Sequence, residues 1–407
     1  HKNQRIAIMA ASLGKIELLK KVLNQRDIQA LAGELFYCAA KHGHHGILEY
    51  LKSRAPREAF TEAVLYKAFY EAAKGGYLNV FHCFESLFPN SEILNFVKKE
   101  DYESFRAAAR SGKLAILEFL IQKLPGEASL MVKAKRSGAL KMAIEQHHFA
   151  VVKFLINLIS SSDVIIVITQ ETLRYAVMSP ELDLLKYLID YLQKHDQNQF
   201  KKEVKPHLLF PAAVMSGRLA TLQYIQSLVT PNQFLELISH GNYEIVRFAA
   251  KCHNTEILAY LVRQVPPQQI PHMMPSNYSA FVEAAKNNNL NALKFFAQQF
   301  PEYLQAMVAS RKYEAFSLAA QHGHVAILRY LGTIAPTQLQ DMIKLDNYGP
   351  ICYAAHAGHL EVIEYLEENA QDLQEMMRTS GYNAFTNAIG FPVITGNLLA
   401  YAHVFRQ

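Results

Sequence analysis

Residues 319–331 read Ala-Ala-Gln-His-Gly-His-Val-Ala-Ile-Leu-Arg-Tyr-Leu, and this stretch decides the fold. Its pair of small residues lets one helix approach its neighbours closely, and Gly323 suits a turn with positive φ at the end of that helix. The apolar residues Ile327, Leu328 and Leu331 have the spacing of one face of a second helix. The stretch therefore predicts two helices joined by a tight turn.

The same frame recurs along the whole chain at intervals of 29 to 37 residues. The copies begin at Ala10, Ala39, Ala72, Ala108, Ala143, Ala176, Ala213, Ala249, Ala284, Ala319 and Ala354, with a degenerate copy at Ala388. Seven of the eleven clear copies have Gly four residues after the first Ala. Asn288, His147 and His253 are tolerable at that place, whereas Pro180 requires a different turn. A repeat of this length predicts a solenoid, in which each repeat buries apolar surface against its neighbours.

Two further positions complete the repeat. An apolar residue three before the first Ala shares its helical face; examples are Phe36, Phe69, Phe105, Phe281 and Phe316. Between repeats a proline opens a short amphipathic stretch, as at Pro56, Pro89, Pro125, Pro231, Pro301 and Pro336. Proline is favoured at the first position of a helix. We therefore expect three helices in each repeat, two long and one short.

The frame closely resembles the ankyrin repeat, clearest in Ala39-Ala40-Lys41-His42-Gly43-His44 and in residues 354–363, and the resemblance covers essentially the whole chain. It implies stacked helix pairs with a concave groove that binds proteins. The sequence departs from the family because the Thr-Pro-Leu-His stretch is missing, as at Glu314-Ala315-Phe316-Ser317, and the Asp/Asn/Gly-rich β-hairpin is absent. We therefore expect an all-α, ankyrin-like solenoid of 11–12 repeats, with short helices in place of most β-hairpins.

The expected organisation is one continuous solenoid over residues 1–407, with an N-terminal capping repeat at 1–24 and a degenerate C-terminal capping repeat at 381–407. Residues 160–182 break the pattern, because the β-branched run from Ser160 to Thr169 favours extended structure. Two interpretations stay open. The segment is either an alternative connector packed on the core, or a bend that divides residues 1–159 from 160–407.

By the resemblance, the two residues between the Ala pair and the Gly face the groove. The first of them reads Ser12, Lys41, Lys74, Arg110, Glu145, Met178, Val214, Lys251, Lys286, Gln321 and His356. Five of these eleven are basic and one is acidic, which favours an acidic peptide segment as partner, most strongly over Lys41, Lys74 and Arg110. The alternative is that these are solvated helix ends, where Lys also interacts well with the helix dipole. The groove candidates are Lys41, His42, Lys74, Arg110, Lys251, Lys286, Gln321, His322 and His356.

A tyrosine stands six residues before the first Ala in seven copies: Tyr66, Tyr102, Tyr243, Tyr278, Tyr313, Tyr348 and Tyr382. The family uses this place for binding, and tyrosine suits interfaces because it is large and amphipathic. Tyr66, Tyr102, Tyr278, Tyr313 and Tyr348 are therefore further candidates for partner contact. Such regularity also fits a packing role, in which the ring closes each repeat against the short helix.

Composition and charge exclude several classes of function. The net charge of +5 divides into +8 over residues 1–160, +1 over 161–300 and −4 over 301–407, which is too mild for a dedicated nucleic-acid binder. No run of 18 apolar residues exists, so we expect no membrane span. The four cysteines form no CxxC pair, and the histidine pairs straddle the Gly turn instead of having metal-ligand spacing. No catalytic motif is present, so we expect no enzyme, no cofactor and no metal.

The first functional hypothesis is a scaffold or adaptor that binds one partner protein through the groove. The divergent repeats resemble those of ankyrin effectors injected by intracellular bacteria, or those of repeat families in amoebae. The first resemblance implies a protein secreted into a host cell cytosol. We also expect a monomer in a reducing cytosol. The second hypothesis is the targeting module of a larger enzyme, because the chain begins at His1 without Met and has the form of a trimmed fragment. A third is an unrecognised activity of the repeats themselves.

Overall fold

The computed structural model describes residues 2–273, 278–372 and 374–376, which form helices and no strand. Contacts divide the chain into two units, His1–Lys205 and Pro206–Gln407. Across the described ranges, no helix combines the length and apolar character that a bilayer crossing requires. The expected all-α helical-repeat solenoid is confirmed. The expected C-terminal capping repeat at 381–407, with Tyr382 and Ala388, lies outside the described residues.

The first unit contains six pairs of helices and their connectors. The first helices of its repeats are α1 (Lys2–Ser12), α3 (Gln25–Lys41), α5 (Glu62–Gly75), α7 (Asn90–Arg110), α9 (Ala128–Glu145) and α12 (Gln170–Val177). The second helices are α2 (Ile16–Val22), α4 (His45–Arg54), α6 (Leu78–Leu87), α8 (Leu114–Lys123), α10 (Phe149–Ile156) and α13 (Leu182–His195). The connectors include η1 (Arg57–Ala59), η2 (Pro125–Glu127), α11 (Ser161–Val167) and α14 (Gln197–Glu203).

The second unit continues the same arrangement. Its first helices are α15 (Pro206–Met215), α17 (Pro231–Lys251), α19 (Ser279–Lys286), α21 (Leu304–Gln321) and α23 (Leu339–Ala357). Its second helices are α16 (Leu219–Ser227), α18 (Thr255–Gln264), α20 (Leu290–Gln299), α22 (Val325–Ile334) and α24 (Leu360–Asn369). Its short connectors are η3 (Pro267–Met273), η4 (Pro301–Tyr303) and η5 (Pro336–Gln338). Pro301 and Pro336 open their connectors as the sequence predicts, whereas Pro267 opens one that was not predicted.

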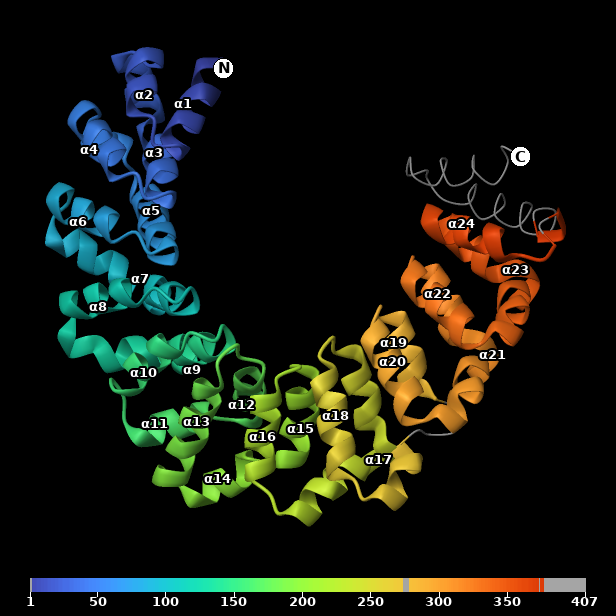
Figure 1. Ribbon diagram of the computed structural model, residues 1–407. Coiled ribbons are helices and arrows are strands. Elements are labelled where there is room, and N and C mark those ends of the chain that lie inside the picture. The colour runs from blue at the N-terminus through green and yellow to red at the C-terminus, as the bar shows by residue number, and fades with distance from the viewer. Residues whose placement is uncertain (1, 274–277, 373, 377–407) are drawn as a thin grey trace. The chain divides into compact units, whose positions relative to one another are not determined.

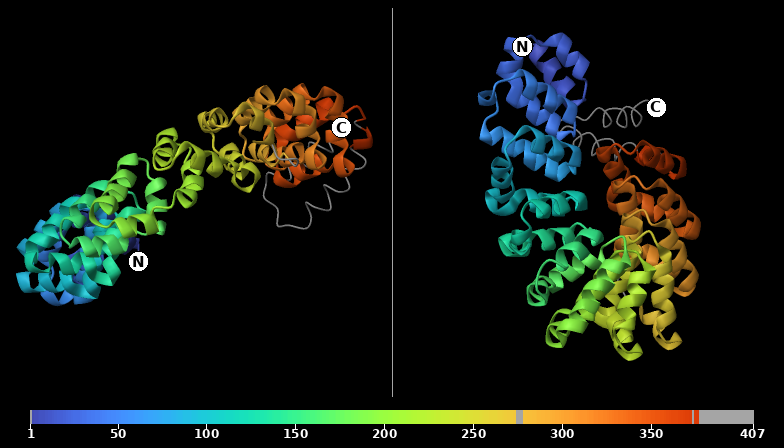
Figure 2. Two further views of the ribbon diagram at one scale, coloured as in Figure 1. Left: turned by 90° about the horizontal axis from the view of Figure 1, so that it is seen from below. Right: turned by 90° about the vertical axis from the view of Figure 1, so that its left-hand side faces the viewer.

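Within each unit the helices form two rows. Each first helix contacts the first helix of the next repeat, from α1 through α3, α5, α7 and α9 to α12 and from α15 to α23 (Figure 1). The second helices make the other row, and Figure 2 shows the stacking of the repeats within each unit from two further directions. We call the exposed side of the row of first helices the first-helix face. It is the surface on which the candidate groove residues stand.

The small-residue frame builds the core between the rows. The Ala pairs are buried, and the phenylalanines three residues before them, such as Phe36 and Phe69, are 0% exposed. Both rings meet the ring of Phe84 on α6 edge to face, with centroids 5.7 Å apart for Phe36, which belongs to the preceding repeat, and 5.5 Å apart for Phe69, which belongs to the same repeat. Such pairs add roughly 0.5–1.5 kcal/mol beyond the burial of their area. Each repeat is thus held by its neighbours.

The glycine at the turn is needed for two reasons. All seven predicted glycines have positive φ, for example +81° at Gly43 and +76° at Gly323, which confirms the prediction. In addition, the residue that follows the turn of the next repeat packs directly against this glycine. A Cβ atom at Gly43 would be 2.5 Å from the ring of Tyr77, and one at Gly323 would be 2.6 Å from Nδ1 of His359.

A left-handed turn replaces the β-hairpin in several repeats. In α7, α9, α17, α21 and α23 the short helix and the first helix are joined by three consecutive residues with positive φ. In α21 these are Arg311, Lys312 and Tyr313, at φ 50°, 57° and 56°. The left-handed conformation costs a residue other than glycine about 1–2 kcal/mol. Contacts of the turn with the next repeat must therefore offset several kcal/mol.

Two local expectations differ from the structure. Residues 161–167 form helix α11 instead of extended backbone, because Ser160 accepts the Asp163 amide at the N-terminus and Val164 and Val167 are buried. His253 has no positive φ, whereas His147 and Asn288 do, as expected. The turn at Pro180 has no positive φ, which confirms that this copy turns differently. The bend considered at residue 159 stays a prediction.

Candidate functional site

The candidate site in the first unit is a row of three basic side chains on the first-helix face. Lys41, Lys74 and Arg110 are exposed in the last turns of α3, α5 and α7. We call these three residues the basic ridge. Only Lys74 lies near a carboxylate, 4.0 Å from Glu71, and within the described residues Lys41 and Arg110 form no ion pair.

In several repeats, the backbone at the end of the first helix is held by the next repeat. Nε2 of His148 lies 3.0 Å from the carbonyl oxygen of Arg110, and His44 contacts the Ser12 carbonyl at the same distance. A carbonyl oxygen only accepts, so these rings carry the proton on Nε2. The contact satisfies a carbonyl that the helix end leaves unpaired and fixes the backbone below the side chain. The arginine side chain is left to face solvent.

The histidines that follow the turns therefore have a structural role, because they hold the backbone of the preceding repeat. His324 and His359 make the same contact, at 3.0 Å from the Lys286 carbonyl and 3.1 Å from the Gln321 carbonyl. Burial lowers the pKa of His324. The ranges that the structure describes hold no group of three His, Cys, Asp or Glu that could bind a metal.

A hollow of about 550 Å³ lies beside the basic ridge, between α3 and α5. Tyr37 and Tyr70 line it together with Lys67, Glu34 and Glu71. The sequence analysis did not single out the two tyrosines, although both stand two residues before an Ala pair. The hollow is lined by charges of both signs. The excess positive charge of this face therefore lies at the turn ends of the helices, where the basic ridge is.

The candidate residues of the second unit are less uniformly basic. Lys251 is 3.6 Å from Glu283, which Arg247 also approaches to 3.6 Å, so a carboxylate of the next repeat offsets these charges. Lys286 is exposed at the end of α19. The expectation for Val214 is wrong, because Val214 occupies the second place of the small pair and is 0% exposed; Met215, two residues after Ala213, stands at the exposed place at 50%.

The other second-unit candidates stand at the ends of α21 and α23. Gln321, His322 and His356 are all exposed, and Nδ1 of His322 lies 2.9 Å from the Leu318 carbonyl. His42 in the first unit has the equivalent contact, at 2.8 Å from the Cys38 carbonyl. These histidines therefore cap the ends of their own helices while presenting one edge to solvent.

The recurring tyrosines reach toward the next repeat. The hydroxyl of Tyr102 donates to Glu127 at 2.6 Å and that of Tyr348 to Glu375 at 2.9 Å. Burial, together with these carboxylates, raises the pKa of both hydroxyls to about 12. Tyr348 is only 4% exposed. Hydroxyls that are bonded in this way favour the packing interpretation.

The remaining tyrosines vary in detail. Tyr313 donates to Asp341 at 3.4 Å, and Tyr66, which lies inside α5 without a left-handed turn, donates to Glu103 at 2.8 Å. Tyr278 precedes α19 with a φ of +46°. All three rings are half-buried, so each retains some surface for a partner.

Comparison with known families supports the repeat frame in the second unit. The model of ankyrin repeats, in three copies, matches residues 281–377, about a quarter of the chain. The match covers the copies at Ala284, Ala319 and Ala354. No curated protein matches the sequence.

Proposed function

We propose that this chain is a non-enzymatic scaffold that binds an acidic segment of a partner protein along the basic ridge. Ankyrin repeats generally mediate protein–protein interaction. The observation that carries the proposal is the row formed by Lys41, Lys74 and Arg110, exposed on successive first helices and almost without carboxylate partners. The roles expected from the resemblance, a monomer and a secreted bacterial effector acting in a host cytosol, stay predictions.

The spacing of the ridge defines the segment that it would accept. Packed helices lie about 8–10 Å apart, and a peptide in the extended polyproline II conformation has three residues per turn and advances about 3.1 Å per residue, so that every third side chain points to the same side. An extended segment with Asp or Glu at every third position therefore matches the three cations. Exposed ion pairs contribute roughly 0.2–1 kcal/mol each. The ion pairs would guide the acidic segment to the ridge and set its alignment along the three cations. Further affinity must come from contacts such as those with Tyr37 and Tyr70.

The test reverses the charge of the ridge. The triple variant Lys41→Glu, Lys74→Glu, Arg110→Glu is compared with the wild-type chain in partner capture from a cell lysate, quantified by mass spectrometry. The proposal predicts proteins that the wild-type chain captures and the ridge variant loses. Unchanged capture contradicts it.

A matched control separates the site from overall charge. Lys21, Lys153 and Lys194 are also exposed and also stand in the last turns of their helices, α2, α10 and α13, but these are second helices. Reversing these three changes the net charge and the helix-dipole interactions by the same amount. The proposal predicts that this control retains its partners, and equal loss in both variants would mean that only net charge matters.

A further inference from the structure

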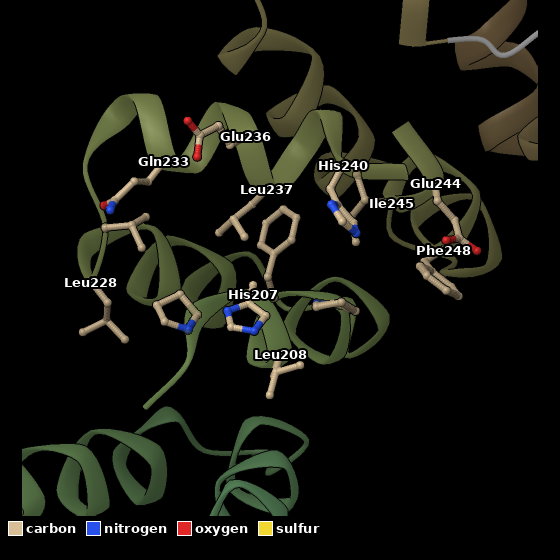
Figure 3. A pocket seen from close by; sticks show the side chains of 14 residues that line it. His207, Leu208, Leu228, Gln233, Glu236, Leu237, His240, Glu244, Ile245 and Phe248 are labelled. Carbon is tan, nitrogen blue, oxygen red and sulfur yellow. The ribbon is translucent and has the colours of Figure 1, made fainter. Parts of the chain in front are cut away.

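The second unit has a hollow of about 730 Å³ between α15 and α17 (Figure 3). Phe210 and Ile245, 2% and 4% exposed, lie at its base. Leu208, which is 41% exposed, and the partly exposed Leu237 and Phe248 form its walls. The hollow is thus mainly apolar, and His207 and His240 face it from the two helices.

Other repeats of the chain carry a tyrosine at the position of His207, six residues before the first Ala. In two of these repeats the tyrosine hydroxyl donates to a carboxylate thirteen residues before the next Ala pair or its degenerate copy. Tyr313 donates to Asp341 at 3.4 Å, and Tyr348 donates to Glu375 at 2.9 Å. The recurring unit is therefore an aromatic ring between two repeats with its hydroxyl on a carboxylate.

The repeat that begins at Ala213 has the carboxylate but not the tyrosine. His207 stands six residues before Ala213, on the first turn of α15, and no left-handed turn precedes it. Glu236 stands thirteen residues before Ala249, the place of Asp341 and Glu375. The Glu236 side chain is exposed at the edge of the hollow and makes no hydrogen bond or ion pair with the described residues.

We infer that this hollow binds a tyrosine side chain from an exposed segment of a partner protein. The ring packs against Leu237 and Phe248. Its hydroxyl donates to Glu236, and a hydrogen bond to a charged acceptor is stronger than one between neutral groups. The site is separate from the basic ridge and extends the proposed function to a second contact of different chemistry.

Volume and chemistry fit this occupant better than a purely apolar side chain. The hollow is large enough for an aromatic ring together with flanking backbone, and ligand sites of this size combine apolar walls with few polar groups. A phenylalanine would fill the walls equally but would leave Glu236 without a donor. The carboxylate thus provides discrimination in favour of a hydroxyl.

The test uses p-cresol, the side-chain analogue of tyrosine, and toluene, the analogue of phenylalanine, on the whole chain. Methyl resonances of Leu, Val and Ile residues are recorded by NMR during titration. We expect shifts centred on Leu208, Leu237 and Ile245, with a dissociation constant on the order of millimolar for so small a ligand. Toluene should bind at least about fivefold more weakly.

Two pairs of variants sharpen the result. His207→Tyr should fill the hollow from within and abolish the p-cresol shifts, whereas His207→Asn should retain them. Glu236→Ala should weaken p-cresol to the level of toluene, whereas Glu256→Ala, which removes an equally exposed carboxylate on α18, should leave binding unchanged. Unchanged thermal unfolding verifies that each variant is folded.

The inference is overturned if p-cresol causes no shifts at the hollow, if toluene binds as tightly, or if His207→Tyr binds p-cresol like the wild-type chain. The ridge variant with Lys41, Lys74 and Arg110 reversed should bind p-cresol normally. Failure of this inference and failure of the proposed function are therefore distinguishable, because each has its own variant and readout.

Discussion

Replacing Gly43 by alanine tests how the repeats are joined. The ring of Tyr77 lies on two glycines, because a Cβ atom would be 2.5 Å from the ring at Gly43 and 2.2 Å from it at Gly75. Gly43 also has a φ of +81°. Gly46, three residues later in α4, has no atom within 4 Å of the added Cβ and no positive φ, which makes it a matched control.

The expected cost of Gly43→Ala has two parts. The left-handed conformation costs alanine about 1–2 kcal/mol, and displacing a packed ring costs about 1–3 kcal/mol. We expect a total of about 3 kcal/mol. Gly46→Ala should instead stabilise by about 0.4–1 kcal/mol, because it lowers the entropy of the unfolded chain in a helical position. In a Tyr77→Ala background the ring contribution disappears, and Gly43→Ala should cost only its conformational part.

Hydrogen exchange measures this effect where it acts. Peptides from α3 and α6, read by mass spectrometry, report local opening, and a loss of about 3 kcal/mol accelerates exchange roughly a hundredfold. Gly46→Ala should slow exchange slightly. Similar exchange in the two variants, or the same cost of Gly43→Ala with and without the Tyr77 ring, would refute the reasoning about this turn.

Two further predictions concern titratable groups. Burial lowers the pKa of His324, so the unfolded chain takes up the proton first, and the stability contribution present above pH about 6.5 should be lost as pH falls toward 5.5. His324→Asn should reduce this dependence of stability on pH, because an asparagine does not titrate and Asn289 donates the equivalent hydrogen bond in the preceding repeat. The measurement is the midpoint of thermal unfolding at pH 7.5 and at pH 5.5. An unchanged difference between the two midpoints contradicts the prediction. Burial also raises the pKa of Cys83 to about 12 and of Cys352 to about 11, so a disulfide reagent at pH 7.5 should modify neither thiol until the chain unfolds. Rapid modification of both thiols in the folded chain would contradict the burial that the structure gives them.

The repeat frame could be predicted because each of its features depends on nearby residues. The spacing of the Ala pair and of Phe36 determines which helical face is buried, and both are buried in the structure. A residue that directly follows a helix often adopts positive φ to end it, and glycine does so without strain. Gly43 and Gly323 both have positive φ, as predicted. Such rules need no knowledge of the partner repeat.

The left-handed turns could not be predicted in this way. Residues such as Arg311 and Lys312 disfavour positive φ when considered alone. The turn also places the hydroxyl of Tyr313 on Asp341 of the next repeat, a contact between residues 28 positions apart that local rules do not include. Helix α11 has a similar cause, because the burial of Val164 and Val167 overrides the β propensity of that run.

The exposure of the three ridge residues could be predicted, and their role in binding stays a proposal. The resemblance placed Lys41, Lys74 and Arg110 on one face, and the structure shows them exposed on successive first helices. The resemblance could not show that the carboxylate of Glu283, in the next repeat, would offset the positive charge of Lys251. The hollow beside Glu236 also escaped prediction, because residues of two successive repeats, on α15 and α17, line it together.

A selection from a random peptide display library on the immobilised whole chain tests the central claim most directly. We expect the wild-type chain to enrich peptides with Asp or Glu at about every third position, and we expect the reversal of Lys41, Lys74 and Arg110 to Glu to remove this enrichment. The variant with Lys21, Lys153 and Lys194 reversed should select the same peptides as wild type. Acidic peptides enriched equally by the ridge variant, or no acidic enrichment by the wild-type chain, would contradict the account.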